Sequence, residues 1–405
     1  MYARRPVNIA STSFRRLLST EASGVKVVSK EDGRPVTQLS LILKGGSRYD
    51  TTPGVAHLLE KFAFKNTAAR SALRLVRESE LLGGQLSSSV GRENIVLTAK
   101  FLREDLPYFV EALSDVAKST IYNEYEFVED VVPLAAFESS QAAKDNLYVA
   151  QEAAHEVAFR NGLGNPILSQ SYNPISIDQV KTYAREVYTK ANLSVYATGV
   201  EHNDLNELVG KFFKNLGSGA PLATPKAQFH SGESRIKALG PTTAVLAFPL
   251  NPSPANTVLS NLLGSGSSVK WSVGGSPLAA AAVKTNSSIT SSVKSYSDAD
   301  LLSIQIGGSD VSAVNAGIQE AIAAVKSLSA NVSEESVARA VAKAKFAEAD
   351  REETDFLAAL EEKTQDYATV NAESIKKAAS DLLNGNKVLS VVGKSHEVPY
   401  LDQLF

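Results

Sequence analysis

The sequence of 405 residues contains no cysteine, one methionine and one tryptophan. The absence of cysteine excludes disulfide bonds, thiolate nucleophiles, and zinc or iron–sulfur sites held by cysteine as chemistry of this chain. No uncharged apolar run approaches the roughly 18 residues that a membrane-spanning helix needs. We therefore expect any association with a membrane complex to go through other subunits.

The chain also lacks an excess of charge of either sign, since its formal net charge is −3 and its pI is about 6.1. This balance gives no bulk electrostatic reason to bind nucleic acid or an anionic membrane surface. With 43% hydrophobic and 21% charged residues the composition is that of a globular protein. The length is enough for roughly two or three domains.

The first 20 residues are basic and contain no acidic side chain, because the first acidic residue is Glu21. This composition is typical of a mitochondrial transit peptide, and we predict one over residues 1–18. A disordered basic tail is the alternative interpretation. The basic residues are Arg4, Arg5, Arg15 and Arg16.

The remaining chain reads as one unit used twice. Residues 180–184 and 193–199 match residues 375–379 and 388–393, and each pair describes a helix that leads into a strand ending in glycine. A period of this length is too long for a solenoid repeat and indicates a duplicated domain. We expect a domain at 19–216, a linker rich in Gly, Ser and Pro at 217–240, and a second domain at 241–405. Each half mixes hairpins with helices, which predicts an α+β fold in which helices cover a mostly antiparallel sheet.

One cluster of residues resembles a metal site with a single defect. The sequence His57-Leu58-Leu59-Glu60-Lys61 falls on a predicted helix, so that His57, Glu60 and Lys61 share one face. The inverted zinc motif H-x-x-E-H places a second histidine where this chain has Lys61. An ammonium has no lone pair for a metal and repels a divalent cation at short range. We therefore predict no metal, no cofactor and no catalytic residue. The alternative interpretation is that His57 and Glu60 stand at this spacing by chance and have no relation to a metal site.

The surrounding sequence strengthens the metal-site interpretation. The stretches 45–50, 53–64 and 155–168 resemble the pitrilysin and insulysin family of zinc peptidases, which includes the subunits of the mitochondrial processing peptidase. This resemblance implies that Glu138 holds the position of the distal zinc ligand. It also implies that Val131 stands where the family has a further glutamate. The pattern is that of a decayed peptidase site.

Three further stretches resemble a non-peptidase branch of this family, the core subunits of mitochondrial complex III (ubiquinol–cytochrome c reductase) in fungi. The resemblance implies a structural role in assembly of a dimeric complex on the matrix side of the inner membrane. The implied partners are the paralogous core protein 1 and cytochrome b, with a respiratory supercomplex as a possible larger assembly. A glycine-rich loop at 264–275 keeps open an alternative, a presequence-recognising subunit of the alpha type. The three stretches are 66–84, 188–193 and 399–402.

Overall fold

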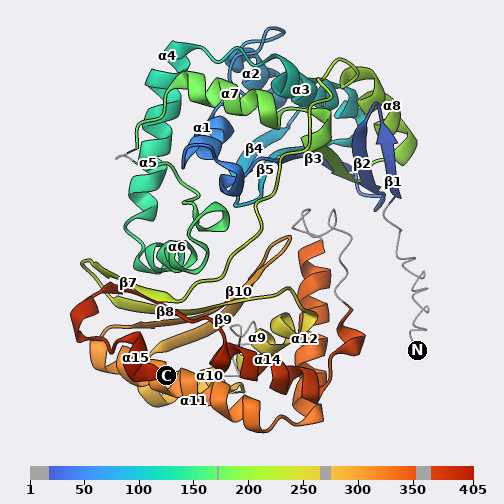
Figure 1. Cartoon of the computed structure of the whole chain (residues 1–405). Coiled ribbons are helices and arrows are strands. Elements are labelled where there is room, and N and C mark those ends of the chain that lie inside the picture. The colour runs from blue at the N-terminus through green and yellow to red at the C-terminus, as the bar shows by residue number, and fades with distance from the viewer. Residues whose placement is uncertain (1–17, 171–172, 265–274, 353–365) are drawn as a thin grey trace, which may run out of the picture.

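The computed structural model describes residues 18–170, 173–264, 275–352 and 366–405. The predicted transit peptide, apart from Leu18, and most of the glycine-rich loop lie outside these ranges. Two mixed sheets dominate the described residues, one in each half of the chain, and helices pack on both (Figure 1). The predicted α+β fold with two homologous halves is confirmed.

The sheet of the first half has the strand order β1-β2-β6-β3-β5-β4. All its strand pairs are antiparallel except β2 with β6. Strand β3 is central because it is apolar along most of its length, and Leu39, Leu41 and Leu43 are buried under the helices. The strands are β1 (Leu18–Ala22), β2 (Val25–Lys30), β3 (Val36–Lys44), β4 (Gln85–Val90), β5 (Asn94–Leu102) and β6 (Leu193–Thr198).

Helices of the first half cover one face of this sheet and also extend toward the second half (Figure 1). The helices are α1 (Val55–Lys61), α2 (Ala72–Leu81), α3 (Leu106–Ser119), α4 (Glu124–Glu126), α5 (Val132–Ala142), α6 (Asn146–Phe159), α7 (Ile177–Val187) and α8 (His202–Phe212). A π-helical turn, η3 (Phe127–Val131), joins α4 to α5. Short 3-10 turns are η1 (Ser47–Tyr49), η2 (Arg103–Asp105), η4 (Gly162–Gly164) and η5 (Lys190–Asn192).

The sheet of the second half has the order β7-β11-β8-β10-β9, and only β7 with β11 is parallel. Its strands are β7 (Gly232–Lys237), β8 (Thr242–Leu250), β9 (Ser288–Ser295), β10 (Asp300–Gly308) and β11 (Val388–Gly393). Its helices are α9 (Pro254–Leu263), α10 (Pro277–Thr285), α11 (Val311–Ala330), α12 (Glu334–Glu352), α14 (Ala372–Asn384) and α15 (Leu401–Leu404). The 3-10 turns η6 (Tyr367–Thr369) and η7 (Ser395–Glu397) complete it.

The order of strands explains the internal repeat of the sequence. Five strands of the first sheet, β2-β6-β3-β5-β4, have the same arrangement as β7-β11-β8-β10-β9. Helix α7 leads into β6 and helix α14 leads into β11, which are the elements that match in sequence. The two halves therefore share one topology.

Two features of the fold differ from the expectations. The segment expected to be a linker, 217–240, contains the strand β7. This strand has charged side chains and half-exposed positions, so it lacks the alternation of apolar and polar residues that predicts a strand. Helix α6 belongs to the first half but packs against β8 and β11 of the second sheet (Figure 1). The second sheet is thus covered on both faces, because Ala150, Ala154 and Ala158 of α6 are buried against it.

A second contact between the halves is made by the turn that joins β9 to β10. Asp298 in this turn accepts a hydrogen bond at 2.7 Å from the guanidinium of Arg48, which is 2% exposed. Arg48 also pairs with Glu93 at 2.7 Å, and Glu93 accepts from the backbone N–H of Ser297. The turn is therefore held by charges from two separate loops of the first half.

Candidate functional site

The motif helix α1 begins at a fixed point because of Asp50. Its carboxylate accepts hydrogen bonds from the backbone N–H groups of Gly54 at 2.7 Å and Ala56 at 3.1 Å. These are groups that the first turn of a helix leaves without an internal partner. Gly54 has a φ of +96°, in the left-handed region that suits glycine. The local sequence thus fixes where His57 and Lys61 emerge from the helix.

Gly54 also allows a second segment to approach the motif. A Cβ atom at this position would lie 2.6 Å from the Cα of Ser169, so only glycine leaves room for that segment. The backbone N–H of Ser169 then donates to Nδ1 of His57 at 3.1 Å. On the other side of the ring, Nε2 of His57 lies 3.0 Å from Oε2 of Glu138. The neutral ring that donates from Nε2 and accepts at Nδ1 satisfies both contacts.

Lys61 lies between two carboxylates. Its Nζ is 2.7 Å from Oε1 of Glu138 and 2.9 Å from Oε2 of Glu60. The second oxygen of Glu60 accepts a hydrogen bond from the hydroxyl of Ser88 on β4. Glu60 is 1% exposed, so its negative charge depends on the nearby ammonium for compensation.

The pKa values of this group shift in a consistent direction. Burial lowers the pKa of His57, and the charge of Lys61 adds to this effect, which exceeds the opposing influence of Glu138 and Glu60. Burial alone would lower the pKa of Lys61, but its hydrogen bonds to Glu138 and Glu60 outweigh burial and raise it. Burial alone would raise the pKa of Glu138, but Lys61 and His57 outweigh it and lower the value. At neutral pH we therefore expect a neutral imidazole, an ammonium and an ionised Glu138.

This arrangement does not fit a catalytic zinc ion. Zinc needs a lone pair from each ligand, whereas Nδ1 of His57 accepts from Ser169 and Nε2 faces Glu138. The ammonium of Lys61 already bridges the two carboxylates that a metal ion and its water would otherwise contact. Within the described ranges, no group of three or more histidine, cysteine or acidic side chains is placed to hold a metal ion.

Val131, the position of the family's further glutamate, is wholly buried. It lies at the end of the π-helical turn η3 and belongs to the apolar core of the first half. A carboxylate there would be surrounded by apolar side chains. The four predicted remnants, in contrast, are brought together by α1 and α5, and they are His57, Glu60, Lys61 and Glu138.

The sequence interpretation missed several residues that shape this region. Ser88 and Ser169 bind the motif side chains, and Arg48 fixes the loop before α1 to the second half. One feature of the sequence could have pointed to Ser88. Residues 88–90 resemble residues 291–293, which fall on β9, the equivalent strand of the second half. His155 is not part of the site: its Nε2 lies 2.8 Å from the hydroxyl of Tyr296, across the contact between the halves.

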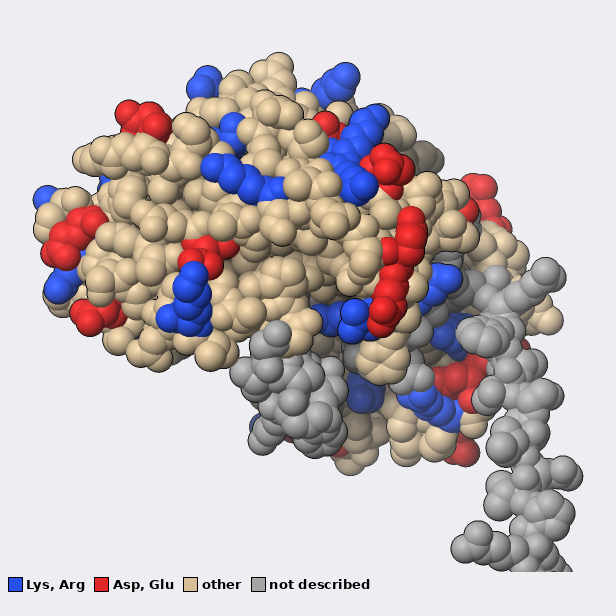
Figure 2. Space-filling view, turned by 90° about the horizontal axis from the view of Figure 1, so that it is seen from below, with Lys and Arg blue, Asp and Glu red and all other residues tan. Residues whose placement is uncertain are grey.

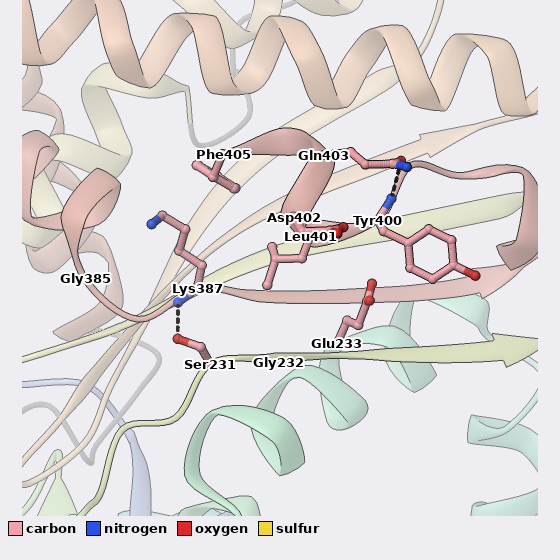
Figure 3. A pocket seen from close by; sticks show the side chains of 10 residues that line it. All are labelled: Ser231, Gly232, Glu233, Gly385, Lys387, Tyr400, Leu401, Asp402, Gln403 and Phe405. Carbon is pink, nitrogen blue, oxygen red and sulfur yellow. Dashed lines mark hydrogen bonds between the residues drawn. The ribbon is translucent and has the colours of Figure 1, made fainter.

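A shallow depression lies far from this region, at the C-terminal end of the second half (Figure 3). Its cavity volume is about 530 Å³, and it lies between the edge strand β7 and the short helix α15. The lining side chains carry both signs of charge, with Lys387 facing Phe405, and Glu233 and Asp402 nearby (Figure 3). None of the candidate site residues lines it.

The fold and the motif together define a class of protein, a two-domain metallopeptidase fold with a lysine in place of one histidine ligand. The sequence profile of the insulinase family (peptidase family M16) matches residues 26–171, and that of the peptidase M16 inactive domain matches residues 174–344. Together with the relatives described next, these matches show that the chain belongs to the insulinase family, peptidase family M16.

Curated relatives make the comparison more specific. The chain is 40% identical to the mitochondrial cytochrome b-c1 complex subunit 2 of Yarrowia lipolytica, over 99% of this chain and 100% of that protein. It is also 40% identical to the same subunit of Neurospora crassa, over 95% of this chain and 90% of that protein. The alpha subunit of the mitochondrial processing peptidase of Solanum tuberosum is 31% identical, but the similarity covers 64% of this chain and 53% of that protein.

Proposed function

We propose that this chain is a structural core subunit of mitochondrial complex III, the counterpart of subunit 2 in the relatives described above. The observation that supports this function best is the similarity to subunit 2 along essentially the full length of both chains. The role is assembly and stability of the complex that transfers electrons from ubiquinol to cytochrome c. The redox centres belong to other subunits, since this chain has no cysteine and no haem-attachment motif.

We further propose that the chain has no peptidase activity of its own. The support is the ion pair of Lys61 with Glu60 and Glu138, which replaces the metal-centred contacts of a working site with a closed set of protein contacts. The positions His57, Glu60, Lys61 and Glu138 are interpreted as remnants that now stabilise the fold. Their role is structural, as in other proteins that keep a fold after its original site is lost.

The proposed place of the subunit is the matrix side of the mitochondrial inner membrane. None of the helices that the structure describes is long and apolar enough to cross a bilayer. Basic and acidic side chains are interspersed on the described surface seen in Figure 2. We propose core protein 1 and cytochrome b as partners within a dimeric complex, and no nucleic acid partner.

Deletion of the gene tests the proposal directly. We expect loss of assembled complex III on native gels and loss of electron transfer from ubiquinol to cytochrome c. Re-expression of the chain should restore both. A fully assembled and active complex in the deletion strain would contradict the structural role.

Affinity isolation from detergent-solubilised mitochondria tests the partners and separates the alternative function. Recovery of cytochrome b and core protein 1 with the tagged chain is the expected result. Recovery of the beta subunit of the processing peptidase instead would favour the alpha-type, presequence-recognising role. Most of the loop on which that alternative rests, residues 265–274, lies outside the described part of the chain.

A further inference from the structure

A second depression lies in the first half, on the side of α7 that faces the end of α3. Its cavity volume is about 550 Å³, a size in the range of small-molecule sites. Lys118 at the end of α3, and Lys181 and Arg185 on α7, contribute positive charges to its wall. None of the residues that line it is acidic. The depression is therefore a concave surface of one sign of charge.

Two of these cations have no protein partner among the described residues. Lys181 and Arg185 are four residues apart on α7 and share one face, where like charges repel each other. Neither makes a hydrogen bond or an ion pair in the part of the chain that the structure describes. Lys118 differs, because its Nζ lies 2.9 Å from Asp115 and 3.2 Å from Ser114. The uncompensated charge is thus concentrated on α7.

Two tyrosine hydroxyls complete the wall. Tyr188 is only 8% exposed, yet its hydroxyl has no hydrogen-bond partner among the described residues, and the same is true of Tyr122. Burial raises the pKa of both side chains, so both hydroxyls keep their proton and can donate it to an anion. Tyr122 has a φ of +55°, a conformation uncommon for residues with a side chain and frequent at binding sites.

The depression near the C-terminus offers a contrast within the same molecule. There, Glu233 and Asp402 accompany Lys387 (Figure 3). Glu233 is also paired with Arg235 at 3.1 Å. Its lining thus combines acidic and basic side chains, so that no net charge of one sign gathers there. The depression beside α7, in contrast, has two cations and two hydroxyl donors without a partner among the described residues and no acidic side chain in its wall, so a bound anion would find donors of one kind there.

We propose that the depression beside α7 binds a phosphate-bearing anion. Phosphate oxygens accept charged hydrogen bonds from guanidinium and ammonium groups, and a tyrosine hydroxyl adds a neutral donor at the buried end. The volume suits a small phosphorylated compound or the headgroup of an anionic phospholipid, which share this chemistry. Neither Lys61 nor its partners line the depression, although Tyr188 lies near enough to Glu60 for that charge to help raise the pKa of its hydroxyl.

Binding of two probes to the full-length chain tests this site. Calorimetric titration with inorganic pyrophosphate measures binding of a free phosphate compound. Flotation with phosphatidylcholine vesicles, with and without phosphatidylglycerol, measures binding to a lipid headgroup. Saturable one-to-one binding of pyrophosphate, without flotation, identifies a free phosphate compound as the ligand. Flotation that requires phosphatidylglycerol identifies a lipid headgroup.

Matched variants connect the binding to the depression. The double variant Lys181→Gln with Arg185→Gln should weaken binding roughly tenfold or more, since two charged donors are lost. Tyr188→Phe keeps the ring and should also weaken binding. The control is Lys376→Gln with Lys377→Gln on α14, the equivalent helix of the second half, which removes the same charge and should leave the affinity unchanged.

Two outcomes would overturn the proposal. One is the absence of binding to both probes, and the other is an equal loss of affinity in the control and in the α7 variant. Arg185→Gln alone is the fallback if the double variant unfolds, because Arg185 is exposed and its replacement does not disturb the core. Melting temperatures of all variants verify that each chain is folded.

Discussion

The ammonium of Lys61 lies 2.7 Å from Oε1 of Glu138, a residue 77 positions later in the chain. In the inverted zinc motif, the position of Lys61 supplies an imidazole to the metal. Here the same position supplies a positive charge directly, and Glu138 keeps a cationic partner although the ligand set is broken. The lysine therefore both ends the metal chemistry and preserves the contact between α1 and α5.

Replacement of Lys61 by methionine should destabilise the fold. It leaves the buried carboxylate of Glu60 without compensation and removes one partner of Glu138. We expect a loss of about 1–3 kcal/mol in the free energy of unfolding, at the lower end for a site that is partly open to solvent. Urea denaturation measures it. Lys65→Met is the control, because its pair with Asp130 is more exposed and should contribute less than about 1 kcal/mol.

Replacement of Lys61 by histidine should create a zinc site. The variant would present two imidazoles one turn apart, with Glu138 at the distal position, and would free Glu60 from its ion pair. We expect close to one zinc per chain by atomic absorption after dialysis, against none for the parent. The second variant, Lys61→His with Glu138→Gln, should lose most of this zinc. Equal zinc contents in all three chains would contradict the prediction.

Replacement of Val131 by glutamate should destabilise the fold, although the family resemblance places a glutamate at this position. Val131 is fully buried, so the new carboxylate would be desolvated without a partner. We expect a loss of about 3 kcal/mol or failure to fold, measured by thermal unfolding. Val128→Glu on the same turn is the control, because Val128 is 60% exposed and its replacement should change stability by less than about 0.5 kcal/mol.

Protonation of His57 and His155 should lower stability as the solution is acidified, whereas protonation of Asp50, whose pKa burial raises to about 8, should add stability over the same range. Burial lowers the pKa of His57 and His155 below the ordinary value of 6.5, so the unfolded chain binds protons that the folded chain does not. The contribution of the two histidines is therefore fully present above about pH 6.5 and is lost as the pH falls toward their folded pKa values. Each histidine contributes a slope of up to about 1.4 kcal/mol per pH unit.

Urea denaturation at several pH values between 7.5 and 5 measures this slope. His155→Gln should reduce the slope, because it removes one of the two buried imidazoles that resist protonation. His396→Gln, whose side chain is exposed, should keep the slope of the parent. An unchanged slope in the His155→Gln chain would refute the assignment.

Local patterns in the sequence predicted most elements and the remnant site, while long-range contacts remained hidden. His57, Glu60 and Lys61 fall on one helix, so their spacing alone places them on one face. Glu138 lies 77 positions from Lys61 and could be placed only by resemblance to a family. Arg48 lies in the stretch 45–50, which resembles the peptidase family. The neighbouring sequence, however, does not indicate that its partner is Asp298, 250 positions later.

The strand β7 was missed for a different reason. Its residues Glu233, Arg235 and Lys237 are charged, as is common on edge strands, and the preceding segment is rich in Gly, Ser and Pro. Periodicity of apolar residues is the main signal of a strand, and an edge strand of this kind lacks it. Its pairing with β11 depends on a partner more than 150 positions away.

Helix α6 has a consequence for how the chain unfolds. Ala150, Ala154 and Phe159 of the first half are buried with Val245 and Leu301 of the second in one shared cluster, beside the separate core of each half. A cut near the expected boundary at 216 would keep α6 with the first half and leave apolar surface exposed on both fragments. The shared cluster therefore couples the two repeats, and we expect that loss of structure in one half destabilises the other.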